Sequence, residues 1–365
     1  MQNLCATNGT AILADSHLIS QTWKMRPEIR GDSYRSLEFA VTHCIQNKLS
    51  LQLGGDTLDS ASPSSDDVRV FREQMDRMQE AGLPVYAIQG NHDKTIPPWF
   101  TAIHAHVQHV HGCVYSPVKG LLMTAFDYMP ANELKEAVAQ IPPTIHTVML
   151  HQAARPIMDI PGAWNFDPAW LPEWVHTVFM GDIHMPVEFT WGEGKRGFYT
   201  GAGHVLALSE PWQTSFLDVR MNDGVMSVTR VPLPFRRYVR VSVRTDDELA
   251  AAVKTVKTVG ADDAVPPVVV VEHAGVVGVQ DAVTAALAER KTAQAGCHAW
   301  YVPVGGSRME TEDAPEAQED ASLGEVLSQC TVDGEVHAFV MDLLTKTPTS
   351  DVIRTMRIKM GAASE

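Results

Sequence analysis

The chain contains 365 residues, 45% of them hydrophobic, which suits a globular protein with room for two domains. Its formal net charge of −15 argues at first sight against a nucleic-acid partner, although metal-binding carboxylates contribute to that charge and bound cations would offset them. No apolar run approaches the ~20 residues that cross a bilayer, the N-terminus lacks the basic start of a secretory signal, and the 5 scattered cysteines favour reduced thiols in a cytoplasmic protein.

The first part of the chain contains five short apolar runs, each followed by glycine, aspartate, asparagine or histidine. These runs are residues 10–14, 49–53, 84–88, 147–151 and 177–181. Runs that are apolar at successive positions are typical of strands buried on both faces, so they predict a helix-flanked α/β sheet with substantial parallel content. Between the second and third runs, Ser64 or Ser65 caps a predicted helix that ends at Gly82 and Pro84. The apolar stripe of that helix is Val68, Phe71, Met75 and Met78.

A second unit begins near Phe235, and its pattern of strand, helix, strand, helix and strand predicts a small α/β domain over residues 234–308. The acidic stretch that follows, 309–322, is typical of a solvated linker. Apolar residues at helical spacing then predict a C-terminal helical segment over 323–365. This segment either packs on its own domain or docks on a partner helix.

Polar residues follow all five apolar runs of the first part. In chain order they are Asp15 and His17, Asp56, Asn91 and His92, His151, and Asp182 and His184. One such motif alone could be a turn. Because ligands of α/β sheets gather at the carboxyl ends of the strands, five motifs in this order predict one site. Carboxylates, imidazoles and an amide oxygen together suit two cations ~3.5–4 Å apart with one bridging carboxylate.

The order D-x-H, G-D, G-N-H-D, H and G-x-x-H resembles the calcineurin-like metallophosphoesterase superfamily over residues 10–205. Within it the chain most resembles the SbcD-type DNA nucleases. GGDTLDSASPS is similar to their GD-loop-PS stretch, and YTGAGHVLALSE (199–210) is similar to their Y-P-G-S segment. The resemblance implies a metallophosphoesterase sandwich of mixed β-sheets flanked by helices over residues 1–233. It also implies that residues 234–308 form the capping domain and that the C-terminal segment binds an ATPase.

The resemblance also implies a role for each motif residue. One metal ion is held by Asp15, His17, Asp56 and His184, and the other by Asp56, Asn91, His151 and the residue at position 182. His92 lies over the scissile phosphate, where it stabilises charge or protonates the departing oxygen. Asp93 orients His92 or a neighbouring loop. The expected cofactors are two divalent cations, Mn²⁺ first and Mg²⁺ second.

Asp182 departs from the family pattern, which has GHIH where this chain has GDIH. An additional carboxylate lowers the net positive charge of a centre of two divalent ions by one unit. It also favours hard Mn²⁺ or Mg²⁺ over metals that prefer imidazole. The substitution therefore predicts a retuned centre; the alternative is that Asp182 points away and the second metal binds weakly.

Two other groups of residues attract attention. The histidines at 104, 106, 109 and 111 alternate as on a surface or half-buried strand, which we prefer to a metal site. The basic residues Lys24, Arg26, Arg30 and Arg35, then Lys195 and Arg196, then Arg236, Arg237 and Arg240, are most simply a solvated surface. The sequence therefore identifies no DNA-binding residue.

The leading hypothesis is a phosphodiesterase acting on double-stranded DNA ends and on single strands, in repair or recombination. By resemblance it works as a homodimer with an SbcC-like coiled-coil ATPase, which supplies much of the DNA-binding surface. A membrane is not among the expected partners. A phosphoesterase for a cyclic nucleotide or phosphomonoester shares the same metal centre and stays open. A third alternative is a DNA-end-binding scaffold whose centre is inactive because of Asp182.

Overall fold

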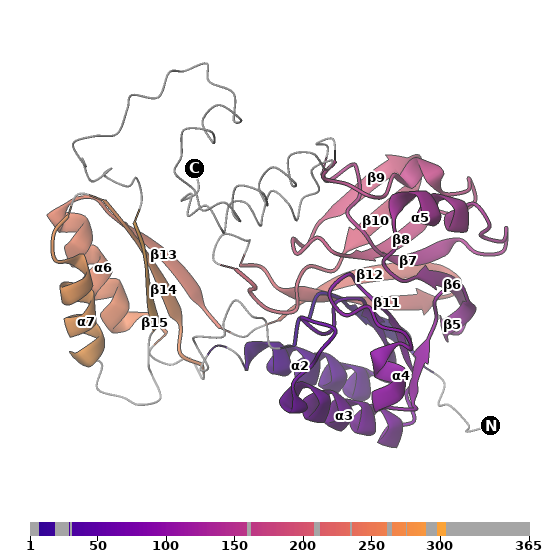
Figure 1. Cartoon of the computed structure of the whole chain (residues 1–365), viewed down its shortest axis with the longest axis horizontal. Coiled ribbons are helices and arrows are strands. Elements are labelled where there is room, and N and C mark those ends of the chain that lie inside the picture. The colour runs from indigo at the N-terminus through magenta and orange to yellow at the C-terminus, as the bar shows by residue number, and fades with distance from the viewer. Residues whose placement is uncertain are drawn as a thin grey trace, which may run out of the picture. The chain divides into compact units, whose positions relative to one another are not determined.

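The computed structural model describes residues 7–18, 29, 31–158, 162–207, 212–233, 236–260, 265–274, 276–289 and 298–303. The chain divides into two compact units, Met1–Arg236 and Arg237–Glu365 (Figure 1). The predicted acidic linker at 309–322 and the predicted helical segment at 323–365 lie outside the described residues.

The first unit contains a six-stranded mixed sheet in the order β12-β11-β1-β2-β3-β4. Its strands are, in that order, Val225–Pro232, Ser215–Asn222, Gly9–Leu13, Leu49–Gly54, Val85–Ile88 and Val107–His109. Strands β1 to β4 are parallel, whereas β11 and β12 pair in antiparallel fashion at one side. The carboxyl ends of β1, β2 and β3 therefore lie at one edge of this sheet.

A second six-stranded mixed sheet has the order β5-β6-β7-β8-β10-β9. Its strands are Val114–Val118, Leu121–Phe126, Thr147–His151, Thr177–Gly181, Lys195–Tyr199 and Glu188–Gly192, in that order. Strands β6, β7, β8 and β10 are parallel, and β5 and β9 are antiparallel edge strands. All five apolar runs are thus strands, as predicted: β1, β2 and β3 in one sheet, β7 and β8 in the other.

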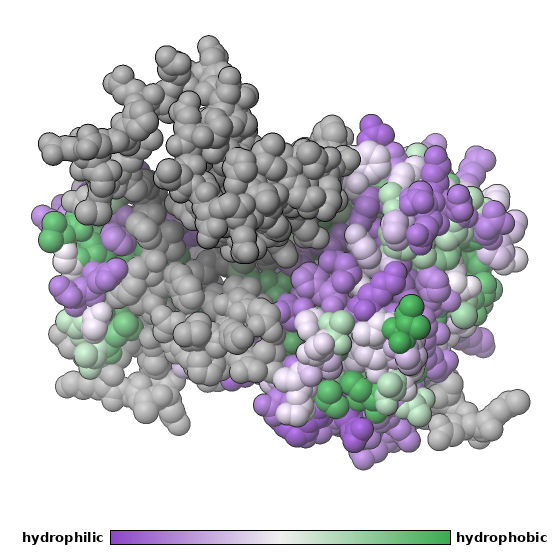
Figure 2. All heavy atoms as spheres, in the orientation of Figure 1, coloured by the Kyte–Doolittle hydropathy of each residue, from purple (hydrophilic) through white to green (hydrophobic). Residues whose placement is uncertain are grey.

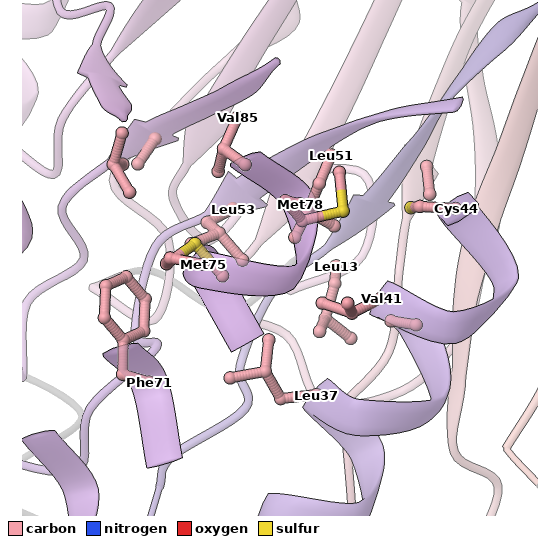
Figure 3. Close-up of a cluster of buried hydrophobic side chains, with 14 of the residues drawn as sticks. Leu13, Leu37, Val41, Cys44, Leu51, Leu53, Phe71, Met75, Met78 and Val85 are labelled. Atoms are coloured by element: carbon pink, nitrogen blue, oxygen red, sulfur yellow. The ribbon is translucent and has the colours of Figure 1, made fainter. Parts of the chain in front are cut away.

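Helices flank the two sheets. They are α2 (Asp32–Asn47), α3 (Ser65–Glu80), α4 (Trp99–Ile103), α5 (Ala131–Val138) and a 3-10 turn at Pro168–Trp170. Residues of α2, α3 and α4 pack on the first sheet (Figures 1 and 3), and residues of α5 pack on the second. This is the predicted sandwich of mixed sheets flanked by helices.

Burial on both faces explains why the strands read as continuous apolar runs. In β1, Ala11 and Leu13 belong to the core beneath the helices, while Ile12 belongs to the core between the sheets. In β7, Leu150 faces outward in the same way and Met149 faces the other sheet. Alternate residues of one strand thus enter different apolar cores.

Helix α3 begins where the sequence predicts. Ser64 accepts a hydrogen bond from the backbone N–H of Asp67, whose carboxylate accepts one from the backbone N–H of Ser64 in return. Phe71, Met75 and Met78 are buried as predicted. Val68 is only half-buried, and Val70 is buried instead, because the core extends to that side of the helix.

The second unit contains a parallel sheet in the order β13-β14-β15, with strands Tyr238–Val243, Val268–His273 and His298–Pro303. Helices α6 (Asp246–Thr258) and α7 (Val279–Glu289) connect them in the predicted order. A capping box of Thr245 and Glu248 starts α6. This is a small α/β domain with its own apolar core.

Few large apolar side chains of the described residues are exposed. On the face drawn in Figure 2, the described residues of the first unit are mostly hydrophilic, and the hydrophobic ones form small separate groups. Ile96 is the most exposed large apolar side chain among the described residues, at 98%. Scattered residues of this kind are ordinary in globular proteins. None of the helices in the described ranges has the length and hydropathy needed to cross a bilayer.

Several residues of the basic clusters are ion-paired. Pairs join Arg35 and Arg236 to Asp32, Arg196 to Glu188, and Arg240 to Glu272. Arg236 is buried, and its guanidinium donates two hydrogen bonds to Asp32 at 2.7 and 2.9 Å. Arg236 is therefore a structural residue of the first unit. The sequence-based interpretation of this residue as part of a solvated surface was wrong.

The core beneath α2 and α3 should dominate the stability of the first unit. Leu51 is fully buried there (Figure 3), so Leu51→Ala should lower the free energy of unfolding by about 2–5 kcal/mol through lost transfer energy and a cavity. Leu122 is 47% exposed, so Leu122→Ala should change it by less than about 0.5 kcal/mol. Urea unfolding followed by tryptophan fluorescence measures both values. Equal effects would contradict this packing.

The buried carboxylate of Asp218, on β11 and in contact with His43 of α2, should make the stability of the fold depend on acid pH. Burial raises the pKa of Asp218, but hydrogen bonds from His43 and Arg220 outweigh it and hold the pKa at about 2. A lowered pKa stabilises the fold above the unfolded value near 4, and that contribution is lost as the pH falls towards 2. Asp218→Asn should therefore lose less stability than the wild type between pH 5 and pH 2 in the same unfolding assay. An unchanged slope would contradict the assignment.

Candidate metal centre

The five predicted motifs meet at one edge of the sandwich. The loops after β1, β2 and β3 come from the first sheet, and those after β7 and β8 come from the second. Backbone hydrogen bonds join the first two loops: Asp15 donates to Gly55 at 3.1 Å, and His17 donates to Asp56 at 2.9 Å. The backbone N–H of Asp182 donates to the Asp15 carboxylate at 3.0 Å and so joins the two sheets.

The backbone is strained at this edge. Asp15, His17, Asp56 and Asp182 all have positive φ angles, of 51°, 39°, 47° and 88°. Six non-glycine residues of the described chain have such angles, so most of them lie in the predicted ligand set. Residues other than glycine rarely adopt positive φ angles without a compensating gain in stability or function. Such backbone strain is more frequent at functional sites.

Two glycines leave room for the site side chains. A Cβ on Gly90 would lie 2.0 Å from Oδ1 of Asp56, and a Cβ on Gly55 would lie 2.3 Å from Nδ1 of His151. Both distances are far below van der Waals contact. These positions therefore need glycine because the carboxylate and the imidazole occupy the space that a larger residue would take.

Asp15, His17 and His184 form one group whose ligand atoms lie within 4.8 Å of one another. His184 Nε2 lies 3.9 Å from Asp15 Oδ1, and the rings of His17 and His184 are 5.3 Å apart. Asp15, Asp56 and His151 form a second group within the same limit. His151 Nε2 lies 3.3 Å from Asp56 Oδ2 and 3.8 Å from Asp15 Oδ1.

Asp56, a member of the second group, also lies close to His17 of the first. Its Oδ2 is 3.6 Å from His17 Nε2 and 3.3 Å from His151 Nε2, while its Oδ1 accepts the backbone N–H of His92 at 2.9 Å. One oxygen thus faces a histidine from each sheet. This is the position that a carboxylate bridging two cations requires.

Three buried atoms of the predicted ligand set make no hydrogen bond within the part of the chain that the structure describes. They are Nε2 of His17, Nε2 of His151 and Oδ1 of Asn91. The other nitrogen of each histidine is engaged: His151 Nδ1 lies 2.8 Å from the Gly54 carbonyl, and His17 Nδ1 lies 3.0 Å from Asp59. Burying polar atoms without partners is costly, so these residues fit bound cations.

The electrostatics of the site follow from its buried charges. Burial raises the pKa of Asp56, but His151, His17 and His92 outweigh it and hold the pKa well below its usual range. Burial lowers the pKa of His151, but the carboxylates around it raise it well above its usual value. Positive charge is therefore favourable at this point, whether it is a proton or a cation.

Asp182 belongs to the same electrostatic cluster. Burial raises its pKa to about 6; Asp15 and Asp56 add to the rise, and His151 opposes it. Its carboxylate is not among the groups of ligand atoms within 4.8 Å that the described residues form. Asp182 therefore lies near the predicted second ion, and the two sequence-based alternatives for its carboxylate stay open.

His92 and Asp93 have different positions. The His92 ring packs edge-on against His17 with centroids 4.9 Å apart, and its ligand atom groups with those of His17 and Asp56. Asp93 is fully buried and accepts backbone N–H groups of Gly90, Thr57 and Leu58. Its carboxylate thus links the loop after β2 to the loop after β3, and the catalytic role predicted for Asp93 stays a prediction.

Sequence reasoning missed two residues of this site. His204, in the loop after β10, is 4% exposed, and its burial together with His17 lowers its pKa to about 3. Asp59 lies against His17 and His92. The signals were present, because TGAGH follows a strand as the other motifs do, and Asp59 ends the GGDTLD motif.

Close packing at Gly90 predicts a mutational effect on metal binding. Gly90→Ala should displace the Asp56 carboxylate and weaken Mn²⁺ binding by about 10-fold or more, as measured by isothermal titration calorimetry. Gly31→Ala is the matched control, because no described atom lies within 4 Å of its Cβ position and its φ is −73°. Equal affinities of the two variants would contradict the close approach.

Comparisons with known proteins add little to this geometry. The chain matches no protein-family model, and no curated protein is significantly similar to it. A solved dimetal phosphatase from Danio rerio is similar with 12% identity and a TM-score of 0.41, over 62% of this chain and 96% of that chain. A second solved structure has 9% identity and a TM-score of 0.36, over 61% and 98%. Likeness at this level carries no argument about function, so the candidate centre rests on its own residues.

Proposed function

We propose that this protein is a metal-dependent phosphodiesterase that acts on DNA, as the SbcD-type nucleases do. The observation that carries the proposal is the Asp56 carboxylate, which faces His17 and His151 while the Nε2 atoms of both histidines make no hydrogen bond among the described residues. A buried carboxylate that faces two such imidazole nitrogens fits a pair of cations.

Each cation would have four ligands. Asp15, His17, Asp56 and His184 would hold one ion, and Asp56, Asn91, His151 and Asp182 would hold the other. The oxygen-rich set at the second ion favours Mn²⁺ or Mg²⁺. When bound, two divalent cations neutralise the charge of a phosphodiester and act as Lewis acids on its oxygens.

His92 would serve the departing oxygen. Its Nδ1 lies 3.2 Å from the Asp59 carbonyl, which only accepts hydrogen bonds, so Nδ1 carries a proton. Nε2 is then the nitrogen that exchanges a proton with a substrate. In the imidazolium form His92 could donate that proton to the leaving oxygen or stabilise charge on the phosphate.

DNA as the substrate, an SbcC-like ATPase as the partner and a homodimer come from the sequence resemblance. Arg35, Arg196, Arg236 and Arg240 form ion pairs, which partly neutralise their positive charge and make it less available to DNA phosphates. A partner that supplies the DNA-binding surface accounts for this. The same ion pairs favour the alternative, a phosphoesterase for a small substrate.

Cleavage of end-labelled duplex and single-stranded DNA in Mn²⁺, Mg²⁺ or EDTA tests the proposal. We expect Mn²⁺-dependent shortening that EDTA abolishes and that Asp56→Asn reduces by at least about 100-fold, since a bridging ligand is lost. Asp66→Asn is the matched control, because the Asp66 side chain is 65% exposed on α3 and should leave the rate unchanged.

Other outcomes select the alternatives. If the protein hydrolyses bis(p-nitrophenyl) phosphate but does not cleave DNA, even in the presence of an SbcC-like ATPase, a small-substrate phosphoesterase would be favoured. No hydrolysis of either substrate would favour a non-catalytic DNA-end-binding scaffold. In that case new activity on replacing Asp182 by histidine would identify position 182 as the cause.

A further inference from the structure

The loop after β7 carries an aromatic side chain that lies outside the apolar core. Trp164 is half-buried, and it is not among the described side chains that pack on the core of the second sheet. Three other tryptophans of the second sheet and its loops, Trp170, Trp174 and Trp191, do pack there. A large ring that is partly open to solvent and outside the core is available to a ligand.

Hydrogen bonds hold the backbone of Trp164 near the candidate metal centre. The next residue, Asn165, donates its N–H to the carbonyl of Ala153 at 3.0 Å, and its side-chain oxygen accepts the N–H of Ala153 at 2.8 Å. Ala153 lies two residues beyond His151, the predicted ligand at the end of β7. The lengths of the peptide unit and of a hydrogen bond then place the Cα atoms of Trp164 and His151 less than about 18 Å apart. A few nucleotides of a DNA strand span this distance.

A cation lies over the Trp164 ring. The guanidinium carbon of Arg155 is 5.6 Å from the ring centroid, which is the geometry of a cation–π contact. Arg155 also pairs with Asp167 at 3.0 Å, and its backbone N–H donates to the Phe166 carbonyl at 2.9 Å. The Trp170 ring lies beside Trp164, with centroids 6.2 Å apart. The indole is therefore held in place before a ligand binds, which lowers the entropic cost of binding to it.

The chemistry of this pair suits the two parts of a nucleotide. An indole face stacks on a nucleobase of any sequence, and a guanidinium attracts a phosphate. The Arg155 side chain is 54% exposed, so its guanidinium is accessible to a phosphate even while it pairs with Asp167. Bases within a duplex are already stacked on both faces, so only an unpaired base can lie on the ring.

We propose that Trp164 binds an unpaired nucleobase of the DNA substrate by stacking, and that Arg155 holds the ring in the orientation for this contact. The inference rests on the proposed function of the metal centre and deepens it, because it assigns a substrate-binding residue beside that centre. Stacking adds affinity for DNA without adding positive charge, which suits a chain whose net charge is −15.

The test is an abasic scan of cleavage by the full chain in Mn²⁺. The value of kcat/KM is measured for single-stranded oligonucleotides of equal length, each of which lacks the base at a different position. For the wild type, loss of the base at one position should lower kcat/KM by about 5–100-fold, the range for one stacked base. Trp164→Ala should lower kcat/KM for the intact oligonucleotide by a similar factor. The same variant should lose the dependence on that position, because the ring and the base act as one interaction.

Two further variants separate stacking from damage to the fold. Trp164→Phe keeps an aromatic face and should retain the dependence on the same position. Trp191→Phe is the matched control, because Trp191 packs on the core and pairs near the start of β10, at the end of the sheet opposite the site. Binding of the oligonucleotide should quench tryptophan fluorescence less in Trp164→Phe than in the wild type, and equally in Trp191→Phe and the wild type. If circular dichroism shows that Trp164→Ala does not fold, this comparison of quenching decides.

The two proposals fail in distinguishable ways. If the wild type cleaves no DNA, the proposed function is wrong and the role of Trp164 is wrong with it. If the wild type cleaves DNA but no abasic position lowers kcat/KM, or if folded Trp164→Ala keeps the profile of the wild type, only the stacking role is wrong. A uniform loss of activity in Trp164→Ala with the positional profile retained would make Trp164 a structural residue of the loop and would also overturn the inference.

Discussion

The buried carboxylate of Asp56 is the contact on which the candidate site depends. It follows β2 of the first sheet, yet its Oδ2 lies 3.3 Å from His151 at the end of β7 in the second sheet. Its Oδ1 accepts the backbone N–H of His92, so the loop after β3 is fixed to the same side chain. One carboxylate therefore contacts loops from both sheets. Position 90 requires glycine because a Cβ there would clash with this carboxylate.

Concentrating negative charge at this edge has a cost. Asp15 and Asp56 are buried, and Asp182 lies in the same cluster with its pKa raised to about 6. Four residues of the set also hold positive φ angles. A fold tolerates such repulsion and strain where function requires them, and two cations would relieve the repulsion directly. The sandwich around the site supplies the compensation, because its strands are buried on both faces in three apolar cores.

A short loop carries much of the organisation of the site. From residue 56 to residue 59, it provides the Asp56 carboxylate, two N–H groups for Asp93 and two contacts to histidines. Asp93 is thus explained as the residue that fastens this loop to the loop after β3. The burial of Arg236 against Asp32 similarly anchors the last residue of the first unit to the start of α2.

The sequence by itself determined the strands, helix α3 and the residues that converge. Each of these depends on a local pattern: apolar runs, a capping box, or polar residues directly after a strand. Only the tertiary structure decided what those residues contact. The partners of Asp93, Asp59 and His204, the burial of Arg236, and the pKa of Asp182 arise between residues far apart in the chain, such as Arg236 and Asp32. Hydrogen bonds and desolvation depend on three-dimensional proximity, which local sequence patterns do not encode.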